Sequence, residues 1–262
     1  MVVIQKGSKM RYKISFITNQ GKVRKLNEDS LLIDEKIISN ISLDKVYFVE
    51  MEKEKALFVV ADGMGGHNKG EIASRFILKR LRDKKESINN KEELIKALKE
   101  IKKELDIIGT KEAFYNMGSV VSGVFFINNR ALIFNIGDCR VYENTFGFAN
   151  LLTTDHSMVY NLYKQGAIEF EEIKNHPKKN IVTSALIANS AQPLKEIYIK
   201  EKEIDKFGEF LICSDGVWES LETSEIEECF KEDEVVECLF KKVMAKEASD
   251  NLSMIYIKVE NE

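Results

Sequence analysis

Proline is scarce in this chain of 262 residues, with only Pro177 and Pro193 present, and no stretch rich in Ser and Gly divides the sequence. Linkers between domains are commonly built from such residues. Their absence predicts one domain, residues 11–262, preceded by a short N-terminal extension, residues 1–10. This length lies near the upper limit for a single hydrophobic core.

The four cysteines form no Cys-x-x-Cys pair and no regular framework; they are Cys139, Cys213, Cys229 and Cys238. Zinc sites of the usual spacing are therefore excluded. We predict that all four are reduced thiols in a cytoplasmic protein. None has an arginine six positions later, as a cysteine-based phosphatase requires. A Gly-rich phosphate loop ending in Gly-Lys-Ser or Gly-Lys-Thr is also missing from the sequence.

Long uncharged runs are missing as well. The longest, residues 113–129, contains polar residues and glycine and is too short to cross a bilayer, and the first residues lack the apolar core of a signal peptide. We predict no membrane segment. The 39 basic and 43 acidic residues give a net charge of -4, so no overall basic character indicates nucleic acid. Only seven basic residues are arginine, which makes each guanidinium informative.

Secondary structure is indicated by the periodicity of the apolar residues. Apolar, β-branched runs bounded by turn residues predict strands at 57–61, 120–127, 131–136, 209–214 and 254–259. Helical spacing predicts helices at 71–82, 91–108 and 224–246. A hairpin at residues 128–130 makes part of the sheet antiparallel, and Asn90 with Glu93 could form a capping box. The elements come in blocks, which predicts α+β layers instead of a doubly wound parallel sheet.

Three aspartates stand where a buried strand meets an exposed turn. Asp62 ends the run 57–61, Asp215 ends the run 210–214, and Asp250 precedes the last strand. An aspartate at a strand end is rigidly held, and a following glycine allows close approach of a ligand. Any single Asp-Gly is ordinary turn chemistry, but three matching contexts favour a site for a hard cation such as Mg²⁺ or Mn²⁺.

Two more places carry acidic residues that could belong to the same site. Asp138 follows the strand 131–136, and Arg24 lies close in sequence to Glu28 and Asp29. The arginine could be a fork for phosphate beside a metal site, or it could form a structural ion pair with an aspartate. The sequence leaves both interpretations open.

Six short motifs recur in the order and spacing found in one family; they are Gly-x-x-Arg-x-x-Asn-Glu-Asp, Ala-Asp-Gly-Met-Gly-Gly-His, Gly-Asp-x-Arg, Asp-His-Ser, Ser-Asp-Gly and Asp-Asn. From about residue 21 to 259 the chain resembles the metal-dependent protein phosphatases of type 2C, the PPM family. Met64 makes it more similar to the bacterial members. The resemblance implies a four-layer α/β/β/α sandwich of two mainly antiparallel sheets, with a flap-like segment at about 155–200.

The same resemblance implies an activity and a set of roles. The expected reaction is hydrolysis of phosphoserine and phosphothreonine in proteins, by direct attack of water activated by two Mn²⁺ or Mg²⁺ ions, with a third ion as an option. It assigns Asp62 to both ions, the Gly63 carbonyl to one of them, and Asp215 and Asp250 to the other. Glu28 and Asp29 would bind an ion directly or support those that do, Asp138 would help to hold the third ion, and Arg24 would hold the substrate phosphate. Phosphoprotein substrates, an opposing Ser/Thr kinase and a monomeric state are also implied.

Some roles stay open at this level. Met64 cannot donate a proton, so His67 is either the general acid or a histidine that orders its loop. His156 and His176 are interpreted as structural, and Trp218 as a core anchor. A catalytically silent, phosphoprotein-binding module and a phosphatase of small molecules are the alternative functions. The silent module would be marked by loss of a metal carboxylate, whereas Asp62, Asp215, Asp250 and Arg24 are all present.

Overall fold

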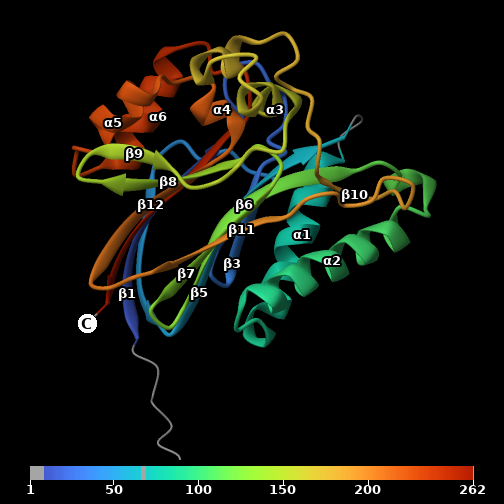
Figure 1. Ribbon diagram of the computed structural model, residues 1–262, viewed down its shortest axis with the longest axis horizontal. Coiled ribbons are helices and arrows are strands. Elements are labelled where there is room, and N and C mark those ends of the chain that lie inside the picture. The colour runs from blue at the N-terminus through green and yellow to red at the C-terminus, as the bar shows by residue number, and fades with distance from the viewer. Residues whose placement is uncertain (1–8, 66–68, 262) are drawn as a thin grey trace, which may run out of the picture.

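The computed structural model describes residues 9–65 and 69–261, and in this part of the chain two antiparallel sheets pack against each other (Figure 1). The first sheet has the order β4 (Tyr47–Lys53), β1 (Met10–Asn19), β13 (Leu252–Asn261), β12 (Phe207–Cys213), β8 (Arg140–Thr145) and β9 (Phe148–Leu151). The second has the order β11 (Tyr198–Glu203), β7 (Arg130–Ile136), β6 (Gly118–Ile127), β5 (Lys55–Met64), β2 (Ser30–Ile33) and β3 (Lys36–Ser39). The short β10 (Leu186–Ile187) pairs with β6.

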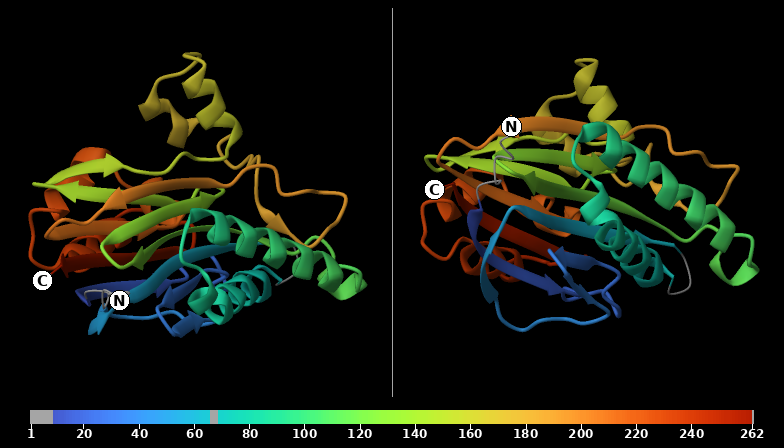
Figure 2. Two further views of the ribbon diagram at one scale, coloured as in Figure 1. Left: turned by 60° about the horizontal axis from the view of Figure 1, so that its bottom comes forward. Right: turned by 90° about the horizontal axis from the view of Figure 1, so that it is seen from below.

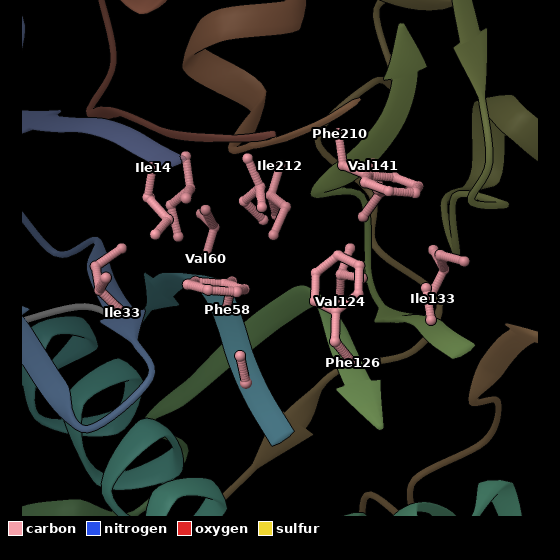
Figure 3. Packing of buried hydrophobic residues seen from close by; sticks show 14 of the residues in the cluster. Ile14, Ile33, Phe58, Val60, Val124, Phe126, Ile133, Val141, Phe210 and Ile212 are labelled. Carbon is pink, nitrogen blue, oxygen red and sulfur yellow. The ribbon is translucent and has the colours of Figure 1, made fainter. Parts of the chain in front are cut away.

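Side-chain alternation along the strands builds the layers. Phe58 and Val60 of β5 face the first sheet, whereas Leu57, Val59 and Ala61 face the helices on the other side. Because both faces of β5 are covered, its sequence is a continuous apolar run instead of an alternating one. Figure 3 shows the central layer, where residues of both sheets interdigitate.

Helices cover both outer faces of the sandwich. Against the second sheet lie α1 (Gly70–Lys84), the 3₁₀ turn η1 (Lys85–Ser87), α2 (Lys91–Ile108) and the 3₁₀ turn η2 (Glu112–Phe114). Against the first sheet lie α3 (Met158–Lys164), the 3₁₀ segment η3 (Phe170–Asn175), α4 (Asp215–Trp218), α5 (Thr223–Cys229) and α6 (Val235–Ala245). The four-layer α+β prediction is confirmed. In Figure 2 the segment with α3 and η3 projects beyond the sheets.

Helix α2 begins where the sequence predicts, and half of the expected capping box is present. The Asn90 side chain accepts a hydrogen bond from the Glu93 amide at 2.9 Å. The Glu93 carboxylate accepts from the amide of Asn89, one residue before the cap, at 2.6 Å. The side chains of Asn90 and Glu93 thus both stabilise the start of the helix, but Glu93 binds the amide of Asn89 instead of that of Asn90.

Two predictions about the C-terminal part are wrong. The single helix expected at 224–246 is two helices, α5 and α6, because the chain turns at residues 230–234. The turn allows a disulfide between Cys229 of α5 and Cys238 of α6, so these two cysteines are not reduced thiols in this structure. The separation of nine residues between these cysteines matches no disulfide or metal motif, so the sequence did not indicate the bond. The chain reversal between α5 and α6 brings the two cysteines together. Cys139 and Cys213 are free and buried.

The N-terminal boundary differs by one residue from the prediction. Met10 is fully buried at the start of β1, pairing with Asn261, so it belongs to the sheet and not to the extension. Residues 1–8 lie outside the described part. In the described ranges, no helix has the length and apolar character needed to cross a membrane.

Candidate metal centre

The predicted acidic residues meet at one end of the sandwich because of strand direction. β5, β7 and β12 run towards this end, whereas β2 and β13 start from it, as the antiparallel pairings require. The ends of β5, β7 and β12 therefore carry Asp62, Asp138 and Asp215. The residues just before β2 and β13 supply the others: Glu28, Asp29 and Asp250.

A cavity of about 540 Å³ opens at this end of the molecule. Its carboxylates come from five separate segments: Glu28, Asp62, Asp138, Asp215 and Asp250. The rest of the lining consists of Arg24, Lys25, Leu26, Gly63, Met64, Gly65, Val120, Asn180, Val182 and Asn251. The sequence-predicted residues are thus brought together, with Asp29 buried behind them.

Asp62 lies within a strand and not in a turn, which corrects the sequence-based placement. β5 continues through Met64, with Asp62 opposite Val120 and Gly63 opposite Ser119 of β6. A Cβ atom on Gly63 would lie 2.2 Å from the Gly70 carbonyl oxygen and 2.6 Å from that of Glu28. Only glycine allows this close approach of backbones. The pairing fixes the Asp62 carboxylate at the cavity.

Asp215 is the first residue of the short helix α4, and Ser214 before it links two buried segments. The Ser214 hydroxyl donates to Oδ2 of Asp29 at 2.9 Å and accepts from the Ser253 amide at 3.0 Å. The other oxygen of Asp29, Oδ1, is buried and has no hydrogen-bond donor in the part of the chain that the structure describes. A buried carboxylate oxygen without a donor is a strong acceptor site for a cation.

Burial and mutual repulsion dominate the electrostatics. Burial raises the pKa of the Asp62 and Asp215 carboxyls well above the ordinary value, and neighbouring aspartates raise it further. Burial also raises the pKa of Asp29 to about 7, although the hydroxyls of Ser253 and Ser214 oppose this rise. Carboxyl groups in such surroundings either take up protons or bind cations.

Arg24 lies at the rim of the cavity and makes an ion pair with one of the acids. Its Nη2 donates to Oδ2 of Asp250 at 2.7 Å, and this hydrogen bond raises the pKa of the arginine. Both side chains are partly exposed. Next to the pair, the side-chain oxygen of Asn251 accepts from the Glu28 amide at 2.8 Å, and its nitrogen donates to the Leu26 carbonyl at 2.8 Å. Asn251 thus holds the Arg24–Glu28 segment against the start of β13.

Asp138 is held through its backbone. The Trp218 indole donates to the Asp138 carbonyl at 3.0 Å, and the Arg140 guanidinium stacks on the indole at 3.6 Å. Arg140 is buried and forms a bidentate pair with Asp155. Burial raises the pKa of the Asp138 carboxyl to about 7, and the charge of Asp155 adds to this rise. Trp218 is thus a core anchor, as predicted, and it also supports the site.

Sequence reasoning missed Glu219. Burial raises the pKa of its carboxyl, which forms an ion pair with Lys179 and contributes to the raised pKa of Asp138 and Asp215. Lys179 belongs to the flap-like segment, so this pair joins that segment to α4. Nothing in the motif spacing marked Glu219, since it follows α4 as one glutamate among many.

No three His, Cys, Asp or Glu side chains within residues 9–65 and 69–261 already form a cage for an ion. Hard cations such as Mg²⁺ do not need one, because they are bound by one or two carboxylates and keep several waters. The donors here are carboxylate and carbonyl oxygens. One oxygen of Asp29 has no hydrogen-bond partner among the described residues, and burial raises the pKa of Asp29, Asp62 and Asp215. These residues therefore fit divalent hard cations, and among the described residues that line the cavity there is no cysteine or histidine that would favour zinc.

Of the remaining predicted residues, His67 lies outside the described part, and Met64 lines the cavity. His156 is buried, and its Nδ1 accepts from the Gly137 amide at 3.0 Å. The Nδ1 of His176 accepts from the Lys178 amide at 3.1 Å. Both of these contacts agree with structural roles.

Comparisons with known proteins agree with this geometry. The family model described as Protein phosphatase 2C matches residues 39–254. The chain is 28% identical over 255 residues to the serine/threonine phosphatase stp of Listeria innocua, an alignment that covers 93% of this chain and 94% of that protein.

Solved structures share the fold. The serine/threonine phosphatase of S. agalactiae has a TM-score of 0.78 and 23% identity, covering 96% of this chain and all of that one. The catalytic domain of the serine/threonine protein phosphatase PstP, in complex with two manganese ions, has a TM-score of 0.76 and 23% identity, with the same coverage. From the family match and the relatives that span nearly its whole length, the chain belongs to the protein phosphatase 2C family.

Proposed function

We propose that this protein hydrolyses phosphoserine and phosphothreonine in proteins. The observation that carries the proposal is one cavity in which five carboxylates from separate segments face an arginine at the rim. Metal-dependent phosphoryl hydrolysis needs both: acids to hold cations and a planar cation to hold the phosphate.

Two Mn²⁺ or Mg²⁺ ions are the proposed cofactors. When bound, they lower the pKa of a water molecule and neutralise negative charge on the phosphate. Asp62, Gly63, Asp215 and Asp250 all line the cavity, so we assign the three carboxylates and the Gly63 carbonyl to the ions, with Asp62 on both. Glu28 and Asp29 complete the surroundings, and Asp138 is the residue for a third ion.

Arg24 is the proposed phosphate ligand. In the structure it binds Asp250, which we assign to an ion. A cation on Asp250 would weaken that pair, and the guanidinium would then be free to take phosphate oxygens at the rim. We therefore propose that Arg24 binds Asp250 when no ion is present and binds the substrate phosphate when an ion occupies Asp250.

His67 is the proposed proton donor to the leaving hydroxyl, since Met64 cannot donate. We expect His67→Ala to lower kcat for a phosphothreonine peptide about 100-fold, a size typical of general acids. The hydrolysis of p-nitrophenyl phosphate needs little protonation of its leaving group and should change far less. Equal losses of kcat on both substrates would mean that His67 orders its loop and does not donate the proton.

The alternative of a silent binding module is disfavoured, since it requires loss of a carboxylate and none of the expected ones is missing. A small-molecule phosphatase would turn over metabolites faster than phosphopeptides. We further propose a cytoplasmic monomer in signalling, opposed by a Ser/Thr kinase. In a reducing compartment the Cys229–Cys238 bond would be open.

The test is turnover of a phosphothreonine peptide with Mn²⁺ and with EDTA, for wild type and Asp62→Asn. Asp233→Asn, in the exposed turn between α5 and α6, is the matched control. We expect wild type and control to be active only with Mn²⁺, and Asp62→Asn to lose at least about 100-fold. Equal turnover by wild type and Asp62→Asn would refute the assignment, and inactivity of all three with Mn²⁺ would favour the silent module.

A further inference from the structure

A second depression, with a volume of about 770 Å³, lies away from the acidic cavity. We call it the basic groove. It runs between β3, the β3–β4 connection and α1, whose positions relative to each other are visible in Figure 1. Its lining consists of Phe16, Lys36, Ile37, Ile38, Ser39, Asn40, Ile41, Leu43, Tyr47, Arg75, Lys79 and Arg82.

The charge of the basic groove is of one sign. Its lining holds four cationic side chains and no Asp or Glu, in a protein whose net charge is -4. Arg75, Lys79 and Arg82 follow the i, i+4, i+7 spacing that places them on one face of α1. Arg82 pairs with Asp83, but Lys36, Arg75 and Lys79 make no ion pair with any residue that the structure describes. Unneutralised cations in a hollow attract an anionic partner.

The floor of the basic groove is apolar and partly open to solvent. Ile41 and Tyr47 keep 44% and 40% of their surface exposed, and the Tyr47 ring stacks on Phe16. An exposed apolar floor bounded by like charges is typical of a binding site for an amphipathic partner.

One wall of the groove is an unpaired strand edge. β3 is the outermost strand of its sheet and pairs only with β2 among the described residues, and β4 is likewise the last strand of the other sheet. Half of the backbone N–H and C=O groups of an edge strand point outward without a partner. Within residues 9–65 and 69–261, no hydrogen bond from outside the β2–β3 hairpin reaches residues 36–39. An extended peptide can complete such an edge.

The groove is connected to the acidic cavity through α1. The Ser74 hydroxyl donates to the Glu28 carbonyl at 2.7 Å, and Arg75, the next residue, lines the groove. On the other side, the Asn27 side chain donates to the Ile41 carbonyl at 2.9 Å. The Gly70 amide donates to Oε1 of Glu28, a residue of the cavity lining, at 3.2 Å. Along α1, the three groove cations of this helix lie about 8 to 18 Å from Gly70, a span of roughly two to six extended residues.

From these observations we propose that the basic groove binds an extended segment of the phosphoprotein substrate in which acidic and apolar residues alternate, added as a strand to β3. The proposal rests on the phosphatase function proposed above. A membrane surface would match the charge, but it cannot use the open backbone edge or reach an apolar floor lying between a strand and a helix. The groove thus selects substrates at a distance from the phosphate.

Binding is tested with the fluorescein-labelled peptide Glu-Ile-Glu-Val-Glu-Ile, by fluorescence anisotropy on the full chain. We expect Arg75→Glu/Lys79→Glu to weaken binding at least about tenfold, because like charges face the peptide. Lys99→Glu/Lys103→Glu on α2, exposed and equally spaced, is the matched control and should bind within about twofold of wild type. A peptide N-methylated at every backbone amide, which has no N–H left to donate to the edge, should also bind at least about tenfold more weakly.

Equal binding of the peptide by wild type and Arg75→Glu/Lys79→Glu would overturn the proposal, as would equal binding of the N-methylated peptide. Stronger association with phosphatidylserine vesicles than with the peptide, lost in the groove variant, would assign the site to a membrane and equally overturn it.

Turnover separates this proposal from the phosphatase assignment. A phosphothreonine peptide extended by the acidic segment should have a kcat/KM about tenfold above the unextended one in wild type, and the advantage should vanish in the groove variant. The hydrolysis of p-nitrophenyl phosphate should be equal in both proteins. An equal kcat/KM for the extended and the unextended peptide in wild type would refute substrate binding at the basic groove. Inactivity of wild type towards p-nitrophenyl phosphate would instead refute the phosphatase function, and the peptide binding measured by anisotropy would be unaffected.

Discussion

Arg24 and Asp250 are 226 positions apart in the sequence, yet the guanidinium donates a 2.7 Å hydrogen bond to the carboxylate at the rim of the acidic cavity. One partner is the proposed phosphate ligand and the other a proposed ion ligand. The two proposed roles would thereby be coupled, since a cation on Asp250 would compete with the arginine and would release it for substrate.

Replacement of Arg24 should therefore affect substrate affinity more than the chemical step. We expect Arg24→Ala to raise KM for a phosphothreonine peptide, and the inhibition constant of inorganic phosphate, by about tenfold or more, because a charge-assisted fork to phosphate is lost. Steady-state kinetics with Mn²⁺ measures both. Arg130→Ala removes another partly exposed, ion-paired arginine and should leave both constants unchanged. An unaltered phosphate inhibition constant in Arg24→Ala would speak against the assignment.

The buried acids should make the stability of the ion-free protein depend on pH. Burial raises the pKa of Asp29 and Asp138 to about 7, and that of Asp62 also rises, from an unfolded value of 3.8. The folded state then holds protons that the unfolded chain has lost. Their stabilising contribution is complete below about pH 4 and is lost as the pH rises to about 7. We expect Tm in EDTA to fall between pH 5 and 8.

Added Mn²⁺ should raise Tm more at pH 8 than at pH 5, because it binds the deprotonated carboxylates. Scanning calorimetry at both pH values measures this. Asp62→Asn removes one buried acid and should flatten the dependence in EDTA, whereas the exposed Asp233→Asn should keep it. A Tm increase by Mn²⁺ that is the same at both pH values would be inconsistent with these shifts.

Trp218 should stabilise the site through one hydrogen bond. Trp218→Phe keeps an aromatic face for Arg140 but leaves the buried Asp138 carbonyl without its indole donor. The expected loss is about 1 to 2 kcal/mol in the free energy of unfolding, measured by urea denaturation. Unchanged stability in Trp218→Phe would mean that the carbonyl finds another donor.

The disulfide between α5 and α6 closes a short loop. Chain-entropy arguments for a sequence separation of nine give a stabilisation of about 2 to 3 kcal/mol. We expect a reductant to lower the free energy of unfolding by up to this amount in guanidinium titrations. Cys238→Ser should already have the free energy of unfolding of the reduced wild type when no reductant is present, and a reductant should not lower it further. Four free thiols in the unfolded, unreduced protein would contradict the bond.

The sequence predicted the interior of the fold better than its edges. β5, β6 and β12 are buried on both faces, so they appear as continuous apolar runs, and these strands were predicted. The edge strands β3 and β4 carry charged residues, and β1 alternates buried with exposed positions. None of these three was predicted. The strand character of β3 and β4 comes from pairing with their neighbours, whereas the alternation along β1 is a strand signal that was not used.

For the candidate site, the motifs located the acids but not their partners. Asp62, Asp215 and Asp250 were found from their positions at strand ends, which antiparallel topology then brings into one cavity. An ion pair of Arg24 with an aspartate was one of two open interpretations, but Asp250 was not predicted as its partner, and Glu219 was missed. Such contacts depend on how remote segments lie in space, which local spacing does not encode.

The number of bound manganese ions is the sharpest test of a metal centre in the acidic cavity. Wild type, Asp62→Asn and Asp233→Asn are titrated with Mn²⁺, and the free ion is followed by electron paramagnetic resonance. We expect two tightly bound ions per chain in wild type and Asp233→Asn, and loss of tight binding in Asp62→Asn, since Asp62 is assigned to both ions. Absence of tight binding in wild type, or an undiminished count in Asp62→Asn, would contradict a metal centre at this end of the sandwich.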